Sequence, residues 1–201
     1  MVIRSLVPED KPKIRRIVEQ IGAFNKEETR VAMELLHEAL SYPERQDYYV
    51  RCAVDEPGSL AGYICFGAIP MTDGCYDLYW IAVDERFSRR GVGGKLLEHM
   101  EDFVVKKKAR RIYVDTSSTP GYEAARSFYE KHGYRVACVL DSFYRQGDDK
   151  IIFVKEVQVI VTKGTRGQGF KGSSQMLKNY KDLKVWKKSY ELCLERKSKE
   201  C

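Results

Sequence analysis

Three glycines within four positions, Gly91, Gly93 and Gly94, mark the stretch of this chain best suited to bind a ligand. An apolar run ending at Val83 precedes them and apolar residues at helical spacing follow, which predicts a strand, a loop and the first turn of a helix. The first N–H groups of a helix have no internal partner, and the helix dipole adds partial positive charge there. Because glycine has no Cβ, an anion can approach these N–H groups closely. The pattern therefore predicts a phosphate-binding loop.

Spacing excludes two common phosphate loops. A Walker loop has Lys and then Ser or Thr directly after its last glycine, whereas Gly94 is followed by Lys95 and Leu96. A dinucleotide-binding loop has a third glycine three positions after the second, and that position, counted from Gly93, is Leu96. The remaining pattern is Gln or Arg, two residues, Gly, one residue, and Gly or Ala. In this chain it reads Ser88-Arg89-Arg90-Gly91-Val92-Gly93.

A second motif lies farther along, over residues 125–134, where the sequence reads ARSFYEKHGY. With the glycine loop before it, this motif resembles the GNAT superfamily of acyl-CoA-dependent N-acyltransferases, and the resemblance covers residues 1–157. Two positions depart from the superfamily pattern. Ser88 stands where Gln or Arg is usual, and Tyr122 stands where Asn is common. Both departures concern side chains and leave the backbone N–H groups of the loop in place.

The expected elements fit an α+β fold. The pattern and the resemblance predict a central mixed, mostly antiparallel sheet of six to seven strands flanked by about four helices, with a further helix in the C-terminal tail. The expected strands are Val2–Val7, Asp47–Val54, Leu60–Ile69, Tyr76–Val83, Arg111–Asp115, Tyr134–Leu140 and Ile151–Val157. The expected helices begin near residues 8, 26, 91 and 122, and Gly133 is placed to end the last of them.

The resemblance implies that acetyl-CoA is the cosubstrate and that backbone groups hold it. Ile81, Ala82 and Val83 would contact the pantetheine arm as an added strand does. The loop and first helical turn would hold the pyrophosphate, through Ser88, Arg89, Arg90, Gly91, Val92, Gly93, Gly94 and Lys95. For the arginine side chains, a solvated turn without a ligand is the alternative.

Acetyl transfer to an amine also needs a base for the amine and an acid for the leaving thiolate. Tyr129 aligns with the tyrosine that often protonates the thiolate in the superfamily, although a buried aromatic is the alternative. Asp77 is the candidate base, expected on the same strand face as Tyr79, Ile81 and Val83. A surface carboxylate is the alternative for Asp77. Asp115, at the end of the next strand, competes for the role.

The acceptor is expected to be the primary amine of a small molecule, such as an amino acid or a polyamine. Aromatic residues near the second to fourth strands could hold a cation, although half or more of them are expected in the core. These are Tyr48, Tyr49, Tyr76, Tyr79 and Trp80. A non-catalytic acyl-CoA-binding module is the alternative function.

Charge divides the 201-residue chain in two. Eleven of its 35 Lys and Arg residues, but only four of its 29 Asp and Glu residues, lie from Gln158 onward. The first 157 residues are therefore near neutral in charge, and the tail is basic. Nucleic acid, if it binds at all, is expected to contact only the tail. We expect a domain over 1–157, a flexible linker over 158–175 and a basic amphipathic helix over 176–201. Residues 176–195 resemble the first helix of the four-helix-bundle proteins encoded in ribosomal-RNA intervening sequences. The tail is either an oligomerisation or docking helix or a remnant of a fusion.

The remaining expectations concern partners and location. The six cysteines form no metal-ligand spacing, so no metal site is predicted. The absence of a signal peptide or a membrane-spanning run predicts a cytoplasmic protein without a membrane partner. The sequence leaves open whether the protein forms a homodimer.

Overall fold

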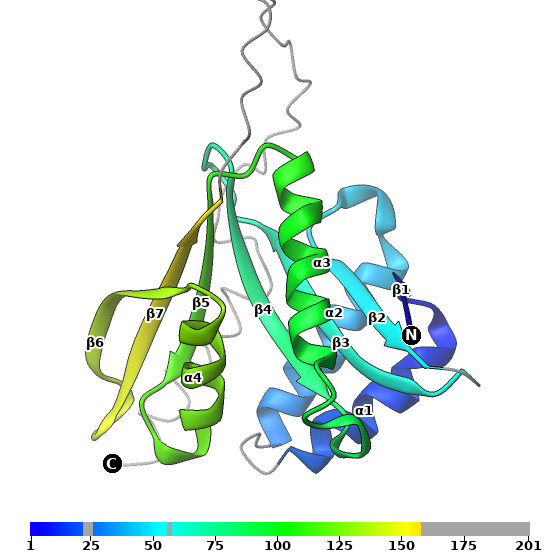
Figure 1. Cartoon of the computed structure of the whole chain (residues 1–201), viewed down its shortest axis with the longest axis horizontal. Coiled ribbons are helices and arrows are strands. Elements are labelled where there is room, and N and C mark those ends of the chain that lie inside the picture. The colour runs from blue at the N-terminus through cyan, green and yellow to red at the C-terminus, as the bar shows by residue number, and fades with distance from the viewer. Residues whose placement is uncertain (22–25, 56–57, 158–201) are drawn as a thin grey trace, which may run out of the picture.

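The structure, a computed structural model, describes residues 1–21, 26–55 and 58–157 (Figure 1). Over these residues, seven strands form one sheet in the order β1-β2-β3-β4-β5-β7-β6. Only β4 and β5 run parallel, and every other neighbouring pair is antiparallel. The expected mixed, mostly antiparallel sheet is confirmed. The predicted linker and tail, and part of the turn around residues 56–57, lie outside the described residues.

The elements follow the expected order, but the last two strands extend farther toward their shared turn than predicted, to Arg145 and from Asp148. The strands are β1 (Val2–Ser5), β2 (Tyr49–Val54), β3 (Leu60–Ala68), β4 (Cys75–Val83), β5 (Arg111–Ser117), β6 (Arg135–Arg145) and β7 (Asp148–Glu156). The α-helices are α1 (Lys11–Gln20), α2 (Lys26–Ser41), α3 (Val92–Lys106) and α4 (Glu123–Lys131). Short 3₁₀ turns are η1 (Pro8–Asp10), η2 (Pro43–Arg45), η3 (Glu85–Phe87) and η4 (Pro120–Tyr122). Gly133 follows α4 with a φ of 82°, the left-handed conformation expected of a residue that ends a helix.

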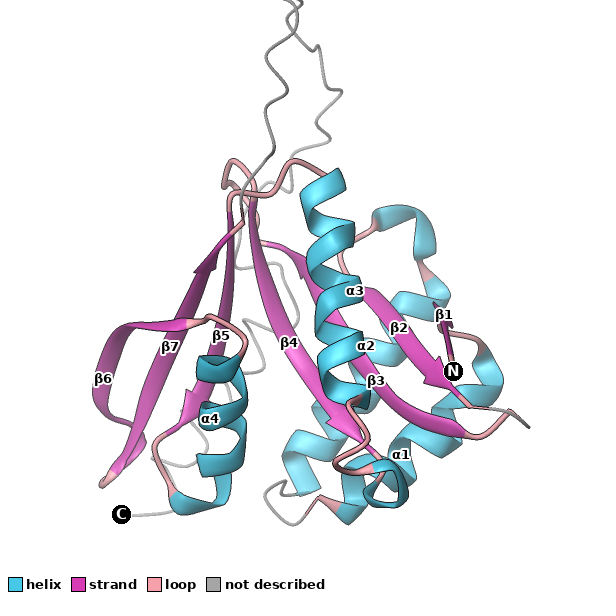
Figure 2. Cartoon of the chain, viewed as in Figure 1, coloured by secondary structure: helices cyan, strands magenta, loops and turns pink. Residues whose placement is uncertain are grey.

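Helices cover both faces of the sheet, and each face has its own apolar core (Figure 2). On one face, α3 packs against β2, β3 and β4, in a core that includes Leu96, Met100 and Ile112, and α4 adds Tyr129. On the other face, α1 and α2 contribute Ile14, Leu36 and their apolar neighbours. These two cores fix β4 from both sides, so its position in the middle of the sheet is well defined.

None of the helices in the described ranges is long and apolar enough to cross a membrane. The same ranges hold no group of three or more His, Cys, Asp or Glu side chains arranged to bind a metal ion.

Candidate active site

The two parallel strands at the centre of the sheet diverge. β4 and β5 pair only from Cys75 to Leu78 on β4 and from Arg111 to Val114 on β5. β4 then continues to Val83 and β5 to Ser117 without pairing with each other (Figure 1). The β5-facing edge of β4 therefore leaves the ladder over the segment that contains Ile81, Ala82 and Val83, as an added strand would require.

A β-bulge corrects one expectation about β4. The pairing with β3 passes from Cys65 opposite Trp80 to Phe66 opposite Leu78, so Tyr79 is the extra residue. Consequently Asp77 and Tyr79 do not share a face with Ile81 and Val83, because the bulge shifts the alternation by one residue. Tyr76, Leu78, Ile81 and Val83 pack on the α3 side, whereas Tyr79, Trp80 and Ala82 pack on the α1 and α2 side.

The glycine loop forms a cradle of unbonded N–H groups at the start of α3. Gly91 has a φ of 75° and turns the chain into the helix, whose first hydrogen bond runs from the Lys95 N–H to the Gly91 carbonyl at 3.1 Å. Within the described part of the chain, the N–H groups of Val92, Gly93 and Gly94 make no hydrogen bond. Such N–H groups at a helix N-terminus bind anions.

Two of the glycines lie against α4. A Cβ atom on Gly93 would lie 3.3 Å from Cε2 of the Phe128 ring and 3.7 Å from Cγ2 of Val83. A Cβ atom on Gly94 would lie 3.1 Å from Nε2 of His132. A cavity of about 400 Å³ lies beside them and includes Gly91, Lys95 and His132 in its lining. Larger side chains at positions 93 and 94 would therefore push α3 away from α4 and fill the cradle.

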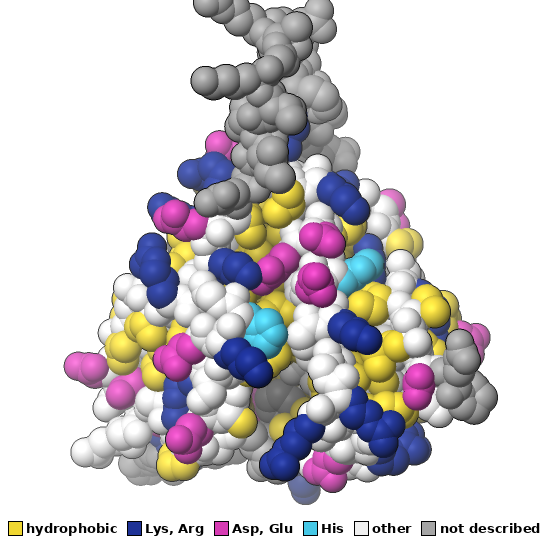
Figure 3. Space-filling view, viewed as in Figure 1, with side chains coloured by type: hydrophobic (Ala, Val, Ile, Leu, Met, Phe, Trp, Pro, Cys, Tyr) yellow, Lys and Arg dark blue, Asp and Glu magenta, His cyan; other side chains and the backbone are white. Residues whose placement is uncertain are grey.

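Basic side chains surround the start of α3. Figure 3 shows them gathered at the lower end of the face that carries α3 and α4. Arg86, Arg89, Arg90 and Lys95 are exposed there. Asp84, which is buried, fixes the turn before the loop, because its carboxylate accepts hydrogen bonds from the Arg86 backbone at 3.0 Å and from the Arg86 guanidinium at 2.8 Å. The hydrogen bond from Arg86 holds the pKa of Asp84 below its usual range. Ser88 is exposed at the end of η3.

Tyr129 lies in the core beneath the cradle. Its side chain is buried, and its ring contacts the rings of Phe128, Tyr134 and Phe153 with centroids 5.6 to 5.9 Å apart. Burial raises the pKa of the Tyr129 phenol, so the group is protonated at neutral pH. The side chain of Tyr129 therefore packs as a core aromatic does, and its phenol carries the proton that a catalytic acid needs. Its neighbour Phe128 faces Gly93 instead, as expected for adjacent helix positions.

Asp77 lies where β4 and β5 begin to part. Its side chain is half-buried and points to the face opposite α3, between Tyr76 and Leu78, which point into the α3 core. Burial, with a smaller contribution from the Asp115 carboxylate and opposed by Lys150, raises the pKa of Asp77 to about 7. A carboxylate with this pKa can accept a proton near neutral pH.

Asp115 lies on the same face of the sheet as Asp77, but its carboxylate is paired with a cation. Asp77 is opposite Tyr113 in the parallel pair, and Asp115 lies two residues farther along β5 on the same side. The Asp115 carboxylate forms an ion pair with the ammonium group of Lys150 on β7. Its charge is therefore already balanced by a neighbour, which makes Asp77 the better candidate base of the two.

The aromatic residues divide between the two faces. Tyr49 stacks on Phe66 and also contacts Phe103 of α3, and Tyr76 is buried in the α3 core. Tyr48 and Tyr79 contact each other on the Asp77 side, with centroids 5.5 Å apart. Only part of the aromatic set can therefore line an acceptor site, in agreement with the expectation that many of these rings are core.

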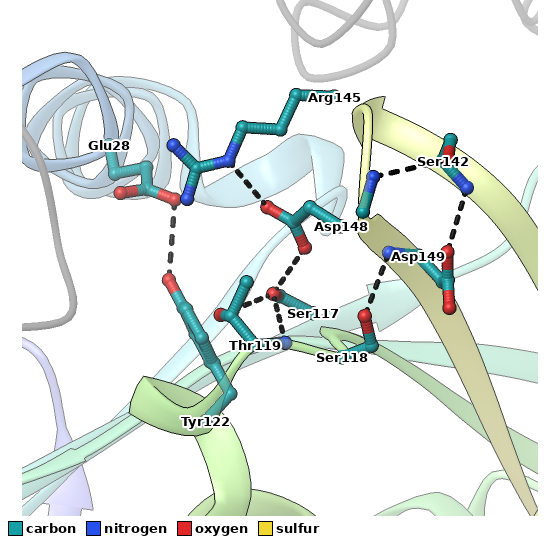
Figure 4. Close-up of polar contacts among 10 residues, drawn as sticks. Glu28, Ser117, Ser118, Thr119, Tyr122, Ser142, Arg145, Asp148 and Asp149 are labelled. Atoms are coloured by element: carbon teal, nitrogen blue, oxygen red, sulfur yellow. Dashed lines mark hydrogen bonds and ion pairs between the residues drawn. The ribbon is translucent and has the colours of Figure 1, made fainter.

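Polar contacts at the ends of β5 and β7 include residues that the motifs do not single out (Figure 4). Asp148, buried, accepts a hydrogen bond from the Ser117 hydroxyl at 2.5 Å and pairs with Arg145 at 3.3 Å. The Tyr122 hydroxyl donates to Glu28 of α2 at 3.3 Å, so Tyr122 joins two segments that lie 94 residues apart in sequence. The contacts of Ser117 with Asp148 and of Tyr122 with Glu28 join residues far apart in sequence, so no local sequence pattern indicates them.

Comparisons with known proteins agree with this geometry. Residues 14–134 match the model of the acetyltransferase (GNAT) family. A solved structure from Desulfovibrio desulfuricans, assigned to the GNAT family, is 39% identical with a TM-score of 0.75, over 78% of this chain and 99% of that one. None of the curated proteins matches the chain.

Two further solved structures share the fold at lower identity. The ribosomal-protein-S18-alanine N-acetyltransferase of Escherichia coli is 22% identical, with a TM-score of 0.63, over 82% of this chain and 99% of that one. An aminoglycoside 6′-N-acetyltransferase in complex with coenzyme A is 19% identical, with a TM-score of 0.61, over 79% and 98%. The chain therefore belongs to the GNAT family of acetyltransferases, enzymes that take their acetyl group from acetyl-CoA.

Proposed function

We propose that this enzyme transfers the acetyl group of acetyl-CoA to the primary amine of a small molecule, with Asp77 as the base and Tyr129 as the acid. The observation that carries the proposal is the half-buried Asp77 carboxyl, with a pKa near 7, at the point where β4 and β5 part. The relatives support an amine acceptor in general, because one is named for aminoglycosides and another for a protein alanine.

The cradle fits coenzyme A. Three unbonded N–H groups at the start of α3 match the charge of a pyrophosphate, and Gly93 and Gly94 leave the space that a side chain would fill. Arg89, Arg90 and Lys95 would add positive charge at the rim, and Ser88 a hydroxyl group. The unpaired edge of β4 at Ile81, Ala82 and Val83 would hold the pantetheine arm through its backbone groups. When bound, acetyl-CoA supplies a thioester carbon for attack and a thiolate as the leaving group.

The residues of the chain then move two protons. Asp77 accepts a proton from the protonated amine, directly or through one water molecule, so that the nitrogen has a free electron pair. Tyr129 donates its phenolic proton to the departing sulfur, a transfer suited to a phenol with a high pKa. The β4 backbone and the α3 cradle align the two reactants, which lowers the entropic part of the barrier.

The experiment is a screen for acetyl transfer. Purified protein is incubated with acetyl-CoA and single amines, and both free CoA and the acetylated amine are measured. We expect CoA release that depends on one class of small amine, with a matching product mass. Binding of acetyl-CoA without transfer to any small amine, or transfer to peptide amines alone, would contradict the proposal.

A further inference from the structure

His132, the first residue after α4, places its imidazole against the glycine cradle. A Cβ atom on Gly94 would lie 3.1 Å from Nε2 of this ring and 4.0 Å from its Cε1. The ring also lines the cavity of about 400 Å³ to which Gly91 and Lys95 contribute. The edge of the imidazole that carries Nε2 therefore borders the space in which a ligand of the cradle would lie.

One hydrogen bond decides which ring nitrogen is available to a ligand. Nδ1 of His132 lies 2.7 Å from the carbonyl oxygen of Phe128, one turn earlier on α4. A carbonyl oxygen can only accept a hydrogen bond, so Nδ1 carries a hydrogen. In the neutral ring Nε2 then has a lone pair, and it becomes a donor only when the ring binds a second proton. In the part of the chain that the structure describes, Nε2 makes no hydrogen bond.

Phe128 and His132 form a pair on one face of α4. They are four positions apart in sequence, and the centroids of their rings are 4.3 Å apart. Phe128 lies against Gly93, and His132 lies against Gly94. Packing on Phe128 and the bond from Nδ1 thus hold the imidazole in one orientation, which is what precise ligand binding requires of a side chain.

Several ionisable residues surround the imidazole. They are Lys95, Glu98 and Glu101 of α3, the exposed Lys131 of α4, Lys155 of β7, and the buried Tyr134. The Lys155 ammonium donates to the His132 carbonyl oxygen at 2.9 Å and pairs with Glu101 at 2.7 Å. Glu98 is four positions beyond Gly94, so it lies one turn farther from the start of the helix. The charge nearest the cradle is therefore positive, and a bound anion is what would favour a second proton on the ring.

We propose that His132 is a further residue that binds the cosubstrate. Its ring takes up a second proton when acetyl-CoA binds, and Nε2 then donates a hydrogen bond to the pyrophosphate. The inference rests on the proposed function, since it takes the cradle to hold this pyrophosphate. A neutral Nε2 would present its lone pair to the phosphate oxygens, whereas the imidazolium donates a charge-assisted hydrogen bond. Acetyl-CoA should therefore bind more tightly as the pH falls through the range in which histidine titrates, and more weakly as the pH rises through it.

Calorimetric titration of the full chain with acetyl-CoA and with acetyl-dephospho-CoA tests the proposal. The second compound keeps the pyrophosphate but lacks the 3′-phosphate, a monoester that itself titrates at about pH 6. Titrations in two buffers of different ionisation enthalpy give the number of protons taken up on binding. With acetyl-dephospho-CoA we expect proton uptake at neutral pH and an affinity about tenfold higher at pH 6 than at pH 8.5. Uptake with acetyl-CoA alone would place the titrating contact at the 3′-phosphate and overturn the inference.

Variants of His132 assign the proton to this residue. His132→Asn keeps a donor for the Phe128 carbonyl and removes Nε2, so it should abolish the proton uptake. It should weaken binding of acetyl-dephospho-CoA about tenfold at pH 6 and change it little at pH 8.5. His132→Gln places a neutral amide near the Nε2 position and should also lose the pH dependence, so it tests the same claim if the asparagine variant fails to fold.

His99→Asn is the matched control. His99 is on α3 but is not among the residues that line the cavity, so this variant should keep both the proton uptake and the pH dependence. Proton uptake that persists in folded His132 variants would overturn the inference and leave the proposed acetyl transfer standing. A folded wild-type protein that binds neither form of acetyl-CoA would overturn both.

Discussion

Asp77 differs from the other carboxylates around the site because it forms no ion pair among the described residues. Asp84 pairs with Arg86, Asp115 with Lys150 and Asp148 with Arg145. Among the described residues, Asp77 makes neither a hydrogen bond nor an ion pair, and its pKa rises to about 7 because burial disfavours the charged form. The same lack of a partner that makes Asp77 a poor contributor to stability makes it a suitable base.

The Asp77→Asn variant should be more stable than wild type above pH 7. The Asp77 carboxyl titrates near pH 7 in the folded protein but near pH 4 in the unfolded chain, so the folded state binds the extra proton between these values. The unfolding free energy of wild type therefore falls as the pH rises through this window, and asparagine removes that loss, worth roughly 1–4 kcal/mol. Urea unfolding at pH 4 and pH 8 measures the difference. An equal gain at both pH values would contradict the shifted pKa.

The Tyr129→Phe variant should separate the two roles of this residue. Phenylalanine keeps the ring against Phe153 and Tyr134, so the melting temperature should change little. If the phenol protonates the thiolate, kcat should fall by roughly 10- to 100-fold with acetyl-CoA affinity retained. Steady-state kinetics and acetyl-CoA titration provide both values. Unchanged kcat would assign Tyr129 to the core alone.

If the start of α3 holds acetyl-CoA through its backbone N–H groups, as we propose, its glycines should matter more than its arginines. Gly93→Val places methyl groups against the Phe128 ring and in the cradle, and should raise the KM for acetyl-CoA at least about tenfold. Arg90→Ala removes an exposed side chain and should change the KM for acetyl-CoA by less than about threefold. Gly93→Ala, with a smaller clash, is the control for folding and should be intermediate. A larger effect of Arg90→Ala than of Gly93→Val would show that side-chain charge holds the cosubstrate.

Local patterns predict the loop and helix but not the bulges. The glycine spacing and the apolar periodicity after Val83 identify the cradle, because both depend on neighbours in sequence. The extra residue at Tyr79 depends on how β4 pairs with β3, which strand propensity does not encode. For this reason the face of Asp77 relative to Ile81 and Val83 is predicted wrongly from alternation. The bulge of β6 between Leu140 and Arg145 also depends on strand pairing, and the contact of Gly93 with Phe128 depends on how α3 packs against α4, so neither is predicted from the sequence.

The domain over the described residues contains the two apolar cores, one on each face of the sheet, that support the candidate site. The core on the α3 side supports the cradle and Tyr129, and the core on the α1 and α2 side supports the face of Asp77. The family model ends at residue 134, so it leaves the basic tail out.

Removal of residues 164–201 should leave the enzyme intact. The linker and basic helix stay predictions, and a remnant of a fusion is the interpretation we favour. The truncated protein should keep the melting temperature, the oligomeric state and the kcat/KM of the full chain. Circular dichroism, light scattering and kinetics compare the two. Dissociation of an oligomer or loss of activity would show instead that the tail is an oligomerisation or docking helix.

The pH dependence of acetyl transfer tests the whole account most directly. The measurement is kcat/KM for a small amine from pH 5 to pH 9, at saturating acetyl-CoA, in wild type and in Asp77→Asn. For wild type we expect an increase that levels off near pH 7, because only the ionised Asp77 can accept the proton. Asp77→Asn should lose about 100-fold or more in activity and show no step at that pH. A wild-type step at pH 7 that persists in Asp77→Asn, with activity retained, would contradict the account.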